Sequence, residues 1–281
     1  YWYATNPLAR FHGTRYLAGP FDSRTLYELG WSGPKPVTLP VSGRVIDYAR
    51  ANRIEAAIVL AEDGTQDVFR IVGREAVRFT HDGRIKSGLA LSPDGSVLAW
   101  AIRSEVQPSS DPAAFYEPDA WEVMSLDTST PDAAPVFLGN GYGPQFFERD
   151  AVPYLLYTAD TSLHLVNLAT GSHQDIGIDR GSLPGFITAV VSPDGRFLLL
   201  PALADFGYAL FAVTGADEAF VLASLGPLPR HTTRAAFSDG RLMSAAQLPT
   251  EAAFRIIGTE DPSVILHGYA LPEDLIFKLI P

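Results

Sequence analysis

A short turn that recurs between apolar segments constrains this chain more than any other feature of its sequence. Ser92-Pro93-Asp94-Gly95 and Ser192-Pro193-Asp194-Gly195 each separate two apolar runs, and Ser238-Asp239-Gly240 is a shortened copy. Proline presets the backbone of the second turn position, aspartate bonds back to nearby amides, and glycine takes the positive φ that reverses the chain. Each copy therefore predicts a β-hairpin.

The distances between these turns reveal a repeat. Asp194 and Asp239 lie 45 residues apart, whereas Asp94 and Asp194 lie 100 residues apart, which leaves room for two units and an insertion. Fainter copies lie near residues 13 and 52, and a degenerate copy lies near residue 150. Six turns result, near positions 13, 52, 94, 150, 194 and 239.

A second hairpin follows the first, so that one unit holds four strands. Leu163 to Leu168, for example, leads through Ala169-Thr170-Gly171 into Gln174 to Ile178. The second strand of a unit, as in Val97 to Trp100 and Phe197 to Leu200, is apolar without alternation, which indicates burial on both faces. Four-stranded units of about 40 to 45 residues between like neighbours are typical of a β-propeller.

The sequence thus predicts an all-β chain that forms one β-propeller domain over residues 1–281. Six four-stranded antiparallel blades are expected, with seven as the alternative, and pairing of the N- and C-terminal segments closes the ring and removes its exposed edges. The expected units are approximately 1–42, 43–86, 87–142, 143–184, 185–230 and 231–273, with a closing strand at 274–281.

The order of these segments carries a family resemblance. An apolar strand, the Ser-Pro-Asp-Gly turn, a second apolar strand and a leucine-rich strand ending in Thr-Gly, as in Leu165 to Gly171, resemble the WD40-like or TolB-type propeller repeat. The resemblance is strong in the units at 94, 194 and 239 and weak in the other three. It implies an architecture and carries no catalytic residue to this chain.

Composition and charge exclude several classes of partner. The formal net charge is −11, with Lys35, Lys86 and Lys278 as the three lysines, so no basic stripe can neutralise nucleic-acid phosphates. The absence of cysteine excludes disulfides and thiolate metal sites. No apolar stretch reaches the roughly 20 residues that a membrane helix needs.

The first residues of the sequence are relevant to the cellular location of the protein. Tyr1-Trp2-Tyr3 is interpreted as part of an edge strand, with a membrane-proximal N-terminus at the lipid interface as the second interpretation. A chain that begins at Tyr1 suggests processing or trimming, and a periplasmic or extracellular location is favoured.

An insertion between the second and third strands of the third unit, Arg103 to Ala120, is the first candidate site. It combines acidic side chains with an aromatic pair, and aromatic residues flanked by polar ones are typical anchors of protein interfaces. The predicted partner-binding residues are Glu105, Asp111, Phe115, Tyr116, Glu117 and Asp119. The competing interpretation is a solvated insertion without a partner.

The connections between blades form the second candidate site. They gather positive charge in an acidic chain, so a small anion or an acidic side chain of a partner could be attracted to the mouth of the axial channel. The predicted channel-mouth residues are Lys86, Asn140, Tyr142, Arg180, Arg230, His231 and Arg234. The competing interpretation is ordinary solvated loop charge.

No linear motif of catalysis or cofactor binding is present. The chain has no Gly-x-Ser-x-Gly elbow, no His-Glu-x-x-His and no phosphate-binding glycine loop, and its six histidines show no metal-ligand spacing. We therefore expect no cofactor, no metal and no catalytic residue identifiable from sequence.

The leading hypothesis is a non-enzymatic scaffold that binds a protein partner, as an accessory or extracytoplasmic subunit of a larger assembly. The alternative is a propeller enzyme, a hydrolase or lyase, whose polar residues converge at the channel mouth in three dimensions. The regulatory propeller of a protease related to prolyl oligopeptidases ranks last, because the sequence shows no second domain with a nucleophile.

Overall fold

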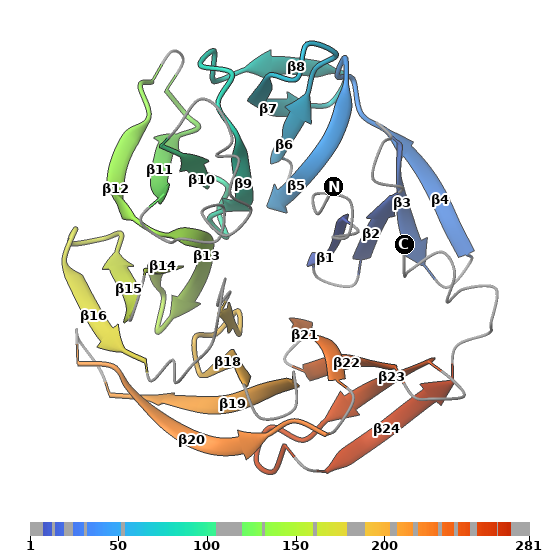
Figure 1. Ribbon diagram of the computed structural model, residues 1–281, viewed down its shortest axis with the longest axis vertical. Coiled ribbons are helices and arrows are strands. Elements are labelled where there is room, and N and C mark those ends of the chain that lie inside the picture. The colour runs from blue at the N-terminus through green and yellow to red at the C-terminus, as the bar shows by residue number, and fades with distance from the viewer. Residues whose placement is uncertain are drawn as a thin grey trace. The chain divides into compact units, whose positions relative to one another are not determined.

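A computed structural model shows an all-β chain (Figure 1). The described residues are 8–12, 15–19, 25–30, 33–51, 54–104, 120–130, 133–159, 162–178, 189–202, 207–215, 219–229, 232–238, 241–247, 252–262 and 264–270. In these ranges the backbone forms 24 strands, which pair as six four-stranded antiparallel sheets. The prediction of an all-β fold built from four-stranded antiparallel units is confirmed.

Each sheet is built from four strands that follow one another along the chain. The first three sheets are β1 (Leu8–His12), β2 (Arg15–Gly19), β3 (Thr25–Gly30) and β4 (Gly33–Thr38); β5 (Arg44–Ala51), β6 (Ile54–Leu60), β7 (Gln66–Val72) and β8 (Glu75–Arg78); and β9 (Lys86–Leu91), β10 (Val97–Arg103), β11 (Trp121–Asp127) and β12 (Val136–Asn140). The other three are β13 (Tyr142–Arg149), β14 (Val152–Thr158), β15 (Ser162–Asn167) and β16 (His173–Gly177); β17 (Val190–Val191), β18 (Phe197–Ala202), β19 (Gly207–Thr214) and β20 (Val221–Pro227); and β21 (Thr232–Ser238), β22 (Arg241–Gln247), β23 (Ala252–Ile257) and β24 (Ile265–Ala270).

The chain divides into two compact units, which are described separately. The first unit is drawn from Tyr1–Phe146 and Tyr157–Asp160, and the second from Phe147–Leu156 and Thr161–Pro281. The predicted closing strand at 274–281 lies outside the described residues, so closure, the number of blades in the ring and the single-domain boundary stay predictions.

The Ser-Pro-Asp-Gly turns join the first and second strands of their sheets, as predicted. In the first copy the N–H of Gly95 donates to Ser92 O at 2.8 Å, and the N–H of Val97 donates to Ser92 Oγ at 2.9 Å. The second copy repeats these bonds from Gly195 and Phe197 to Ser192, both at 2.9 Å. Identical local bonds thus arise from identical local sequence.

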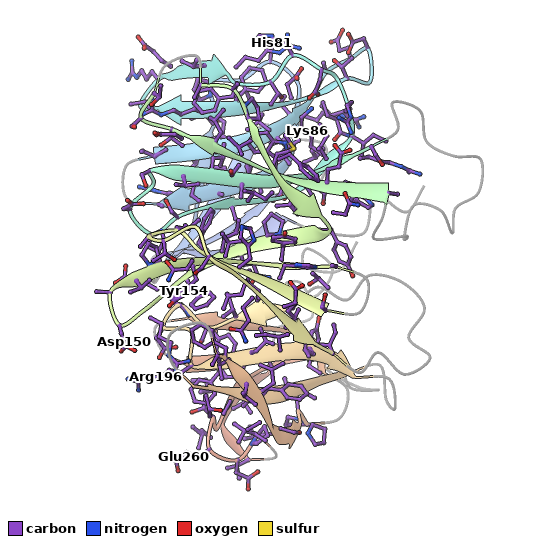
Figure 2. All side chains as sticks on the ribbon, turned by 90° about the vertical axis from the view of Figure 1, so that its left-hand side faces the viewer. His81, Lys86, Asp150, Tyr154, Arg196 and Glu260 are labelled. Carbon is purple, nitrogen blue, oxygen red and sulfur yellow. The ribbon has the colours of Figure 1, made fainter. Side chains whose placement is uncertain are left out.

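The degenerate turn near residue 150 uses a different backbone. Asp150 and Ala151 both have positive φ, 52° and 63°, which is the conformation that a two-residue hairpin turn requires. The turns at Asp150 and Arg196 lie at the same edge of the second unit (Figure 2). The spacing of the repeat therefore predicted a turn that the residue types at this position do not indicate.

The second strands of the third and fourth sheets, β10 and β14, are buried on both faces, as their continuous apolar sequence predicted. Six of the seven residues of β10 are buried, and so are the last five of β14. In the first unit, Trp100 and Leu98 of β10 pack with Leu89 of β9 and Ile58 of β6 in one apolar cluster. Burial of this kind contributes about 1.5 to 3 kcal/mol for each large apolar side chain.

The second unit is held by an aromatic cluster between two successive sheets. The rings of Phe147 and Tyr154 stack with centroids 5.2 Å apart, and Tyr154 meets Phe220 edge-on at 5.3 Å. The guanidinium carbon of Arg149 lies 5.0 Å from the centroid of Phe220 and its Nη1 donates to Val213 O at 3.2 Å. These contacts join β13 and β14 to β19 and to the segment just before β20.

Candidate functional site

The insertion of the third unit lies between the strands where the sequence placed it, and it begins one residue later than predicted. β10 ends at Arg103 and β11 begins at Trp121, which confirms that the extra residues lie between the second and third strands of this sheet. The six predicted partner-binding residues, Glu105, Asp111, Phe115, Tyr116, Glu117 and Asp119, lie outside the described residues. What the structure describes is the base of the insertion, Arg103, Ser104, Ala120 and Trp121, which we call the insertion root.

The two ends of the insertion are bonded to each other at this root. Ser104 donates twice to the carbonyl oxygen of Ala120, through its backbone N–H at 2.9 Å and through Oγ at 2.8 Å. Trp121 and the side chain of Arg103 are both buried. The bonds between Ser104 and Ala120 therefore extend the β10–β11 ladder by one residue pair. The insertion starts from a base that is fixed by these bonds.

Arg84, in the connection between β8 and β9, binds the root from a neighbouring segment. Its Nε donates to Arg103 O at 2.7 Å, and its Nη2 donates to Glu122 Oε2 at 3.1 Å. Because both strands of the hairpin are held by one planar guanidinium, the root is fixed in orientation as well as in register.

The connection that carries Arg84 is itself held by Lys86. The side chain of Lys86 is fully buried, and Nζ donates to Gln66 O at 2.7 Å, to Arg84 O at 3.0 Å and to the carboxylate of Asp82. Burial lowers the pKa of Lys86, against the opposing effect of the Asp82 and Asp67 carboxylates. All three N–H donors of Lys86 are thus used inside the protein.

A second set of bonds fixes the start of the same connection. Asp67 accepts a hydrogen bond from Thr80 Oγ1 at 2.9 Å and is paired with Arg78. Thr80 Oγ1 in turn accepts from the N–H of Val68 at 2.9 Å. The segment from Thr80 to Lys86 is therefore tied to β7 at both ends, and it forms a rigid support for the insertion root.

Two of the predicted channel-mouth residues are buried at the starts of strands, which argues against the competing interpretation of solvated loop charge for these two, and the assignment of the set to a channel mouth stays a prediction. Lys86 begins β9 and lies inside the first unit (Figure 2), and Tyr142 begins β13 and is also buried. Both strands start earlier than the apolar pattern indicated; in β9 the first residue, Lys86, finds hydrogen-bond partners inside the protein. Asn140 ends β12 and is exposed; Arg180, Arg230 and His231 lie outside the described residues, and Arg234 is on β21, where its side chain is not described.

Sequence reasoning missed Arg84, Ser104 and Glu122, which build the root. No motif marks them, because Arg84 and Glu122 are 38 residues apart and meet only when β9 and β11 occupy one sheet. A usable signal was present in Ser104 and Ala120, which lie at the two ends of the predicted insertion.

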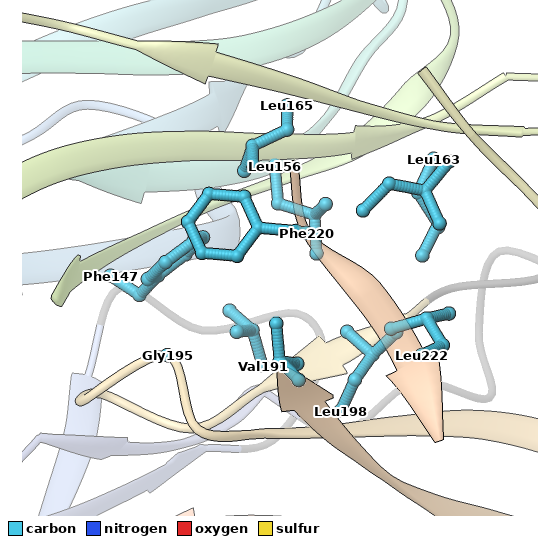
Figure 3. A pocket seen from close by; sticks show the side chains of 11 residues that line it. Phe147, Leu156, Leu163, Leu165, Val191, Gly195, Leu198, Phe220 and Leu222 are labelled. Carbon is cyan, nitrogen blue, oxygen red and sulfur yellow. The ribbon is translucent and has the colours of Figure 1, made fainter. Parts of the chain in front are cut away.

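A small cavity lies in the second unit between the sheets of β13–β16 and β17–β20 (Figure 3). Its volume is about 20 Å³, and it is lined by Phe147, Leu156, Leu163, Leu165, Ile176, Val191, Gly195, Leu198, Val213, Phe220 and Leu222. This space is about that of a single water molecule, and the side chains offer no hydrogen bond to hold one. It is a packing void in the core.

Two further properties concern metals and membranes. Among the residues that the structure describes, no three His, Asp or Glu side chains are grouped so as to hold a metal ion. No helix in the described part of the chain has the length and apolar character needed to cross a bilayer.

Comparison with known proteins identifies the fold. No protein-family model matches the sequence, and no curated protein matches it significantly. Among solved structures, the β-propeller domain of Cps50 (Swd1) from Myceliophteria thermophila is similar with a TM-score of 0.58 and 15% identity, over 95% of this chain and 89% of that one. TolB from Acinetobacter baumannii is similar with a TM-score of 0.53 and 14% identity, over 87% of this chain and 63% of that one.

A peptidase is also among the similar structures. The puromycin-hydrolyzing peptidase of Mycobacterium tuberculosis gives a TM-score of 0.60 and 17% identity, over 96% of this chain but 44% of the peptidase. This chain therefore spans less than half of that protein's length. Together with the four-stranded sheets, these similarities show that the chain has the fold of WD40-like and TolB-type β-propellers.

Proposed function

We propose that this β-propeller is a protein-interaction module that engages its partner through the insertion between β10 and β11, as a subunit of a larger assembly. The observation that supports the proposal is the insertion root. Ser104 and Ala120 close its base, and Arg84 holds both flanking strands. A loop on a fixed base loses less conformational freedom on binding than one on a mobile base, so more of its contact energy becomes affinity.

The composition of the insertion indicates the chemistry of the partner. Glu105, Asp111, Glu117 and Asp119 give it negative charge, and Phe115-Tyr116 provides an aromatic pair. Aromatic side chains dominate the binding energy of many interfaces, and acidic side chains favour encounter with a basic surface. The partner we infer is a protein with a basic surface around an apolar pocket.

Site-specific crosslinking tests this proposal in the intact chain. A photoreactive benzoylphenylalanine replaces Phe115 in one variant and Glu260, an exposed residue between β23 and β24, in the control. We expect one or a few defined protein adducts from position 115 and none from position 260. Equal adduct patterns from the two positions would contradict the proposal.

A second variant tests the root itself. Arg84→Met removes the bonds to Arg103 and Glu122 without changing any residue of the insertion, so we expect a several-fold weaker interaction with the partner identified by crosslinking. Arg74→Met, in the exposed turn between β7 and β8, is the control. Unchanged affinity in Arg84→Met with loss in Arg74→Met would show that the root has no part in binding.

The enzyme alternative, with a site at the channel mouth, is favoured by one observation, the similarity to the puromycin-hydrolyzing peptidase. Lys86 cannot serve as an anion-binding group in such a site, because the three N–H donors of its ammonium group already bind acceptors inside the protein. Of the three members of the predicted set whose side chains the structure describes, Asn140 is exposed. Crosslinking from position 140 to a protein partner would favour docking over catalysis at this place.

A further inference from the structure

Three side chains on one face of the sheet β13–β16 contact one another in a row: a serine hydroxyl, a histidine ring and a carboxylate. Ser162 Oγ lies 3.3 Å from His164 Nε2, and His164 Nδ1 lies 2.6 Å from Asp175 Oδ1. Each ring nitrogen of the histidine thus faces one partner, the hydroxyl on one side and the carboxylate on the other.

Strand geometry fixes this arrangement. Ser162 and His164 are two residues apart on β15, so their side chains emerge from the same face, and His164 is the register partner of Asp175 on β16. β15 and β16 lie side by side, with β16 at the edge of the sheet (Figure 1). Leu163 and Leu165, which point to the opposite face, are buried in the core and hold β15 in this orientation.

We propose that Ser162, His164 and Asp175 form an acyl-transfer triad that acts on carboxylic esters. Such triads are recognised by geometry and roles rather than by sequence position. Asp175 accepts the Nδ1–H of His164, which leaves the Nε2 lone pair directed at the Ser162 hydroxyl. Ser162 is the nucleophile, His164 the general base, and Asp175 the positioning residue.

The residue opposite Ser162 leaves room for a substrate. Gly177 is the register partner of Ser162, and a Cβ at this position would meet no heavy atom of the described residues within 4 Å. Cross-strand partners project from the same face, so the open space adjoins the serine hydroxyl. An acyl group can approach Oγ over the Gly177 backbone without displacing a side chain.

The reaction proceeds in two balanced steps. Ser162 Oγ forms a bond to the ester carbonyl carbon while His164 Nε2 takes the hydroxyl proton; the bond to the alkoxy group then breaks, and the leaving group takes that proton from His164. Water attacks the acyl-serine in the same way, releases the carboxylic acid and restores the hydroxyl. No oxidant, reductant or metal takes part.

This activity is independent of the proposed binding function. The triad lies in the second unit, on the third and fourth strands of a sheet, whereas the insertion root belongs to the first unit. Crosslinking at position 115 and acylation at Ser162 therefore succeed or fail separately.

A fluorophosphonate probe tests the triad on the full chain. Attack by Oγ forms a bond to phosphorus and expels fluoride, so we expect one phosphonylated serine, Ser162, identified by peptide mass spectrometry. Ser162→Ala abolishes labelling, and His164→Ala slows it by about 100-fold or more. Ser172→Ala and His173→Ala, on the same hairpin, serve as controls and label at the unchanged rate.

Two more variants separate catalysis from a structural role. Gly177→Val suits a strand and fills the open space, so it should block labelling while thermal unfolding stays unchanged. Asp175→Asn should lower kcat for p-nitrophenyl acetate with little change in KM, and Asp175→Glu should restore part of it. Absent labelling, labelling of another serine, or wild-type rates in His164→Ala would each overturn the proposal.

Discussion

The carboxylate of Asp47 on β5 accepts a hydrogen bond at 2.8 Å from the backbone N–H of Leu89 on β9, and so joins the first strands of two successive sheets. The ladder between β5 and β6 shifts register beside Asp47, and that between β9 and β10 shifts beside Leu89. Such irregularities leave backbone groups unpaired. A side-chain oxygen of one sheet thus satisfies a backbone donor of the next.

Asp47→Ala should be strongly destabilising for this reason. The N–H of Leu89, in a residue with 0% exposure, and that of Tyr48 both lose the Asp47 carboxylate as acceptor. We expect the free energy of unfolding to fall by about 2 to 4 kcal/mol. Urea denaturation measures the loss, and hydrogen exchange should show faster exchange of the Leu89 amide. Unchanged exchange there would contradict the role assigned to Asp47.

Gly195→Ala should lower the free energy of unfolding more than the same substitution at a glycine whose turn leaves space for a Cβ. A Cβ at Gly195 would clash with Cδ2 of Phe147, and φ is +65°. Gly64 has φ +85° with no heavy atom within 4 Å, so Gly64→Ala reports the backbone term alone. We expect losses of about 2 to 4 kcal/mol for Gly195→Ala and about 1 kcal/mol for Gly64→Ala. Equal losses by thermal unfolding would show that Phe147 moves aside.

Ala151→Gly should stabilise the protein. Ala151 is exposed and adopts φ 63°, which an L-residue with a Cβ adopts at a cost of about 1 kcal/mol. Glycine removes that cost, and the flexibility that it adds to the unfolded chain offsets part of the gain. The expected increase is about 0.5 kcal/mol in the free energy of unfolding, measured in urea. Ala169→Gly, in an exposed turn position without positive φ, should give no increase.

The turns between first and second strands show which parts of the fold could be predicted from the sequence. Ser92 and Ser192 bond to the residues that their sequences dictate, because proline, aspartate and glycine act within five residues. The turn at Asp150 has none of this local signal and was found from the repeat length. Local chemistry and periodicity together thus predicted the four-stranded sheets.

The candidate sites were predicted less well, because their contacts are distant in sequence. Lys86 was placed in a connection between blades, yet it begins β9 and is buried, with bonds to Gln66 and Asp82 that no periodicity encodes. The contact of His164 with Asp175 was accessible in principle, since both lie in a predicted hairpin around Thr170-Gly171. Residue type alone does not distinguish such a pair from two unrelated surface groups.

The Asp94 turn should become weaker in acid, and the sign follows from its hydrogen bonds. Ser92 Oγ donates to Oδ1 at 2.6 Å, and Ser96 donates through its N–H at 3.0 Å and its Oγ at 2.7 Å. These donors, Ser92 first, hold the pKa of Asp94 below its ordinary value of about 4. A lowered folded-state pKa gives stability that is present above the unfolded-state pKa and is lost as the pH falls through the folded-state pKa.

Asp94→Ala should therefore lower the free energy of unfolding by about 1 kcal/mol at neutral pH. The difference from the parent chain should shrink as the pH falls below about 4 and then through the lower folded-state pKa, where the carboxylate of the folded parent becomes protonated. Asp94→Asn is the matched control: it keeps one acceptor oxygen and cannot titrate, so its stability should show a shallower pH dependence in this window. Urea denaturation from pH 7 to pH 2 measures all three chains. A constant difference between Asp94→Ala and the parent over this range would show that the aspartate acts by shape rather than by charge.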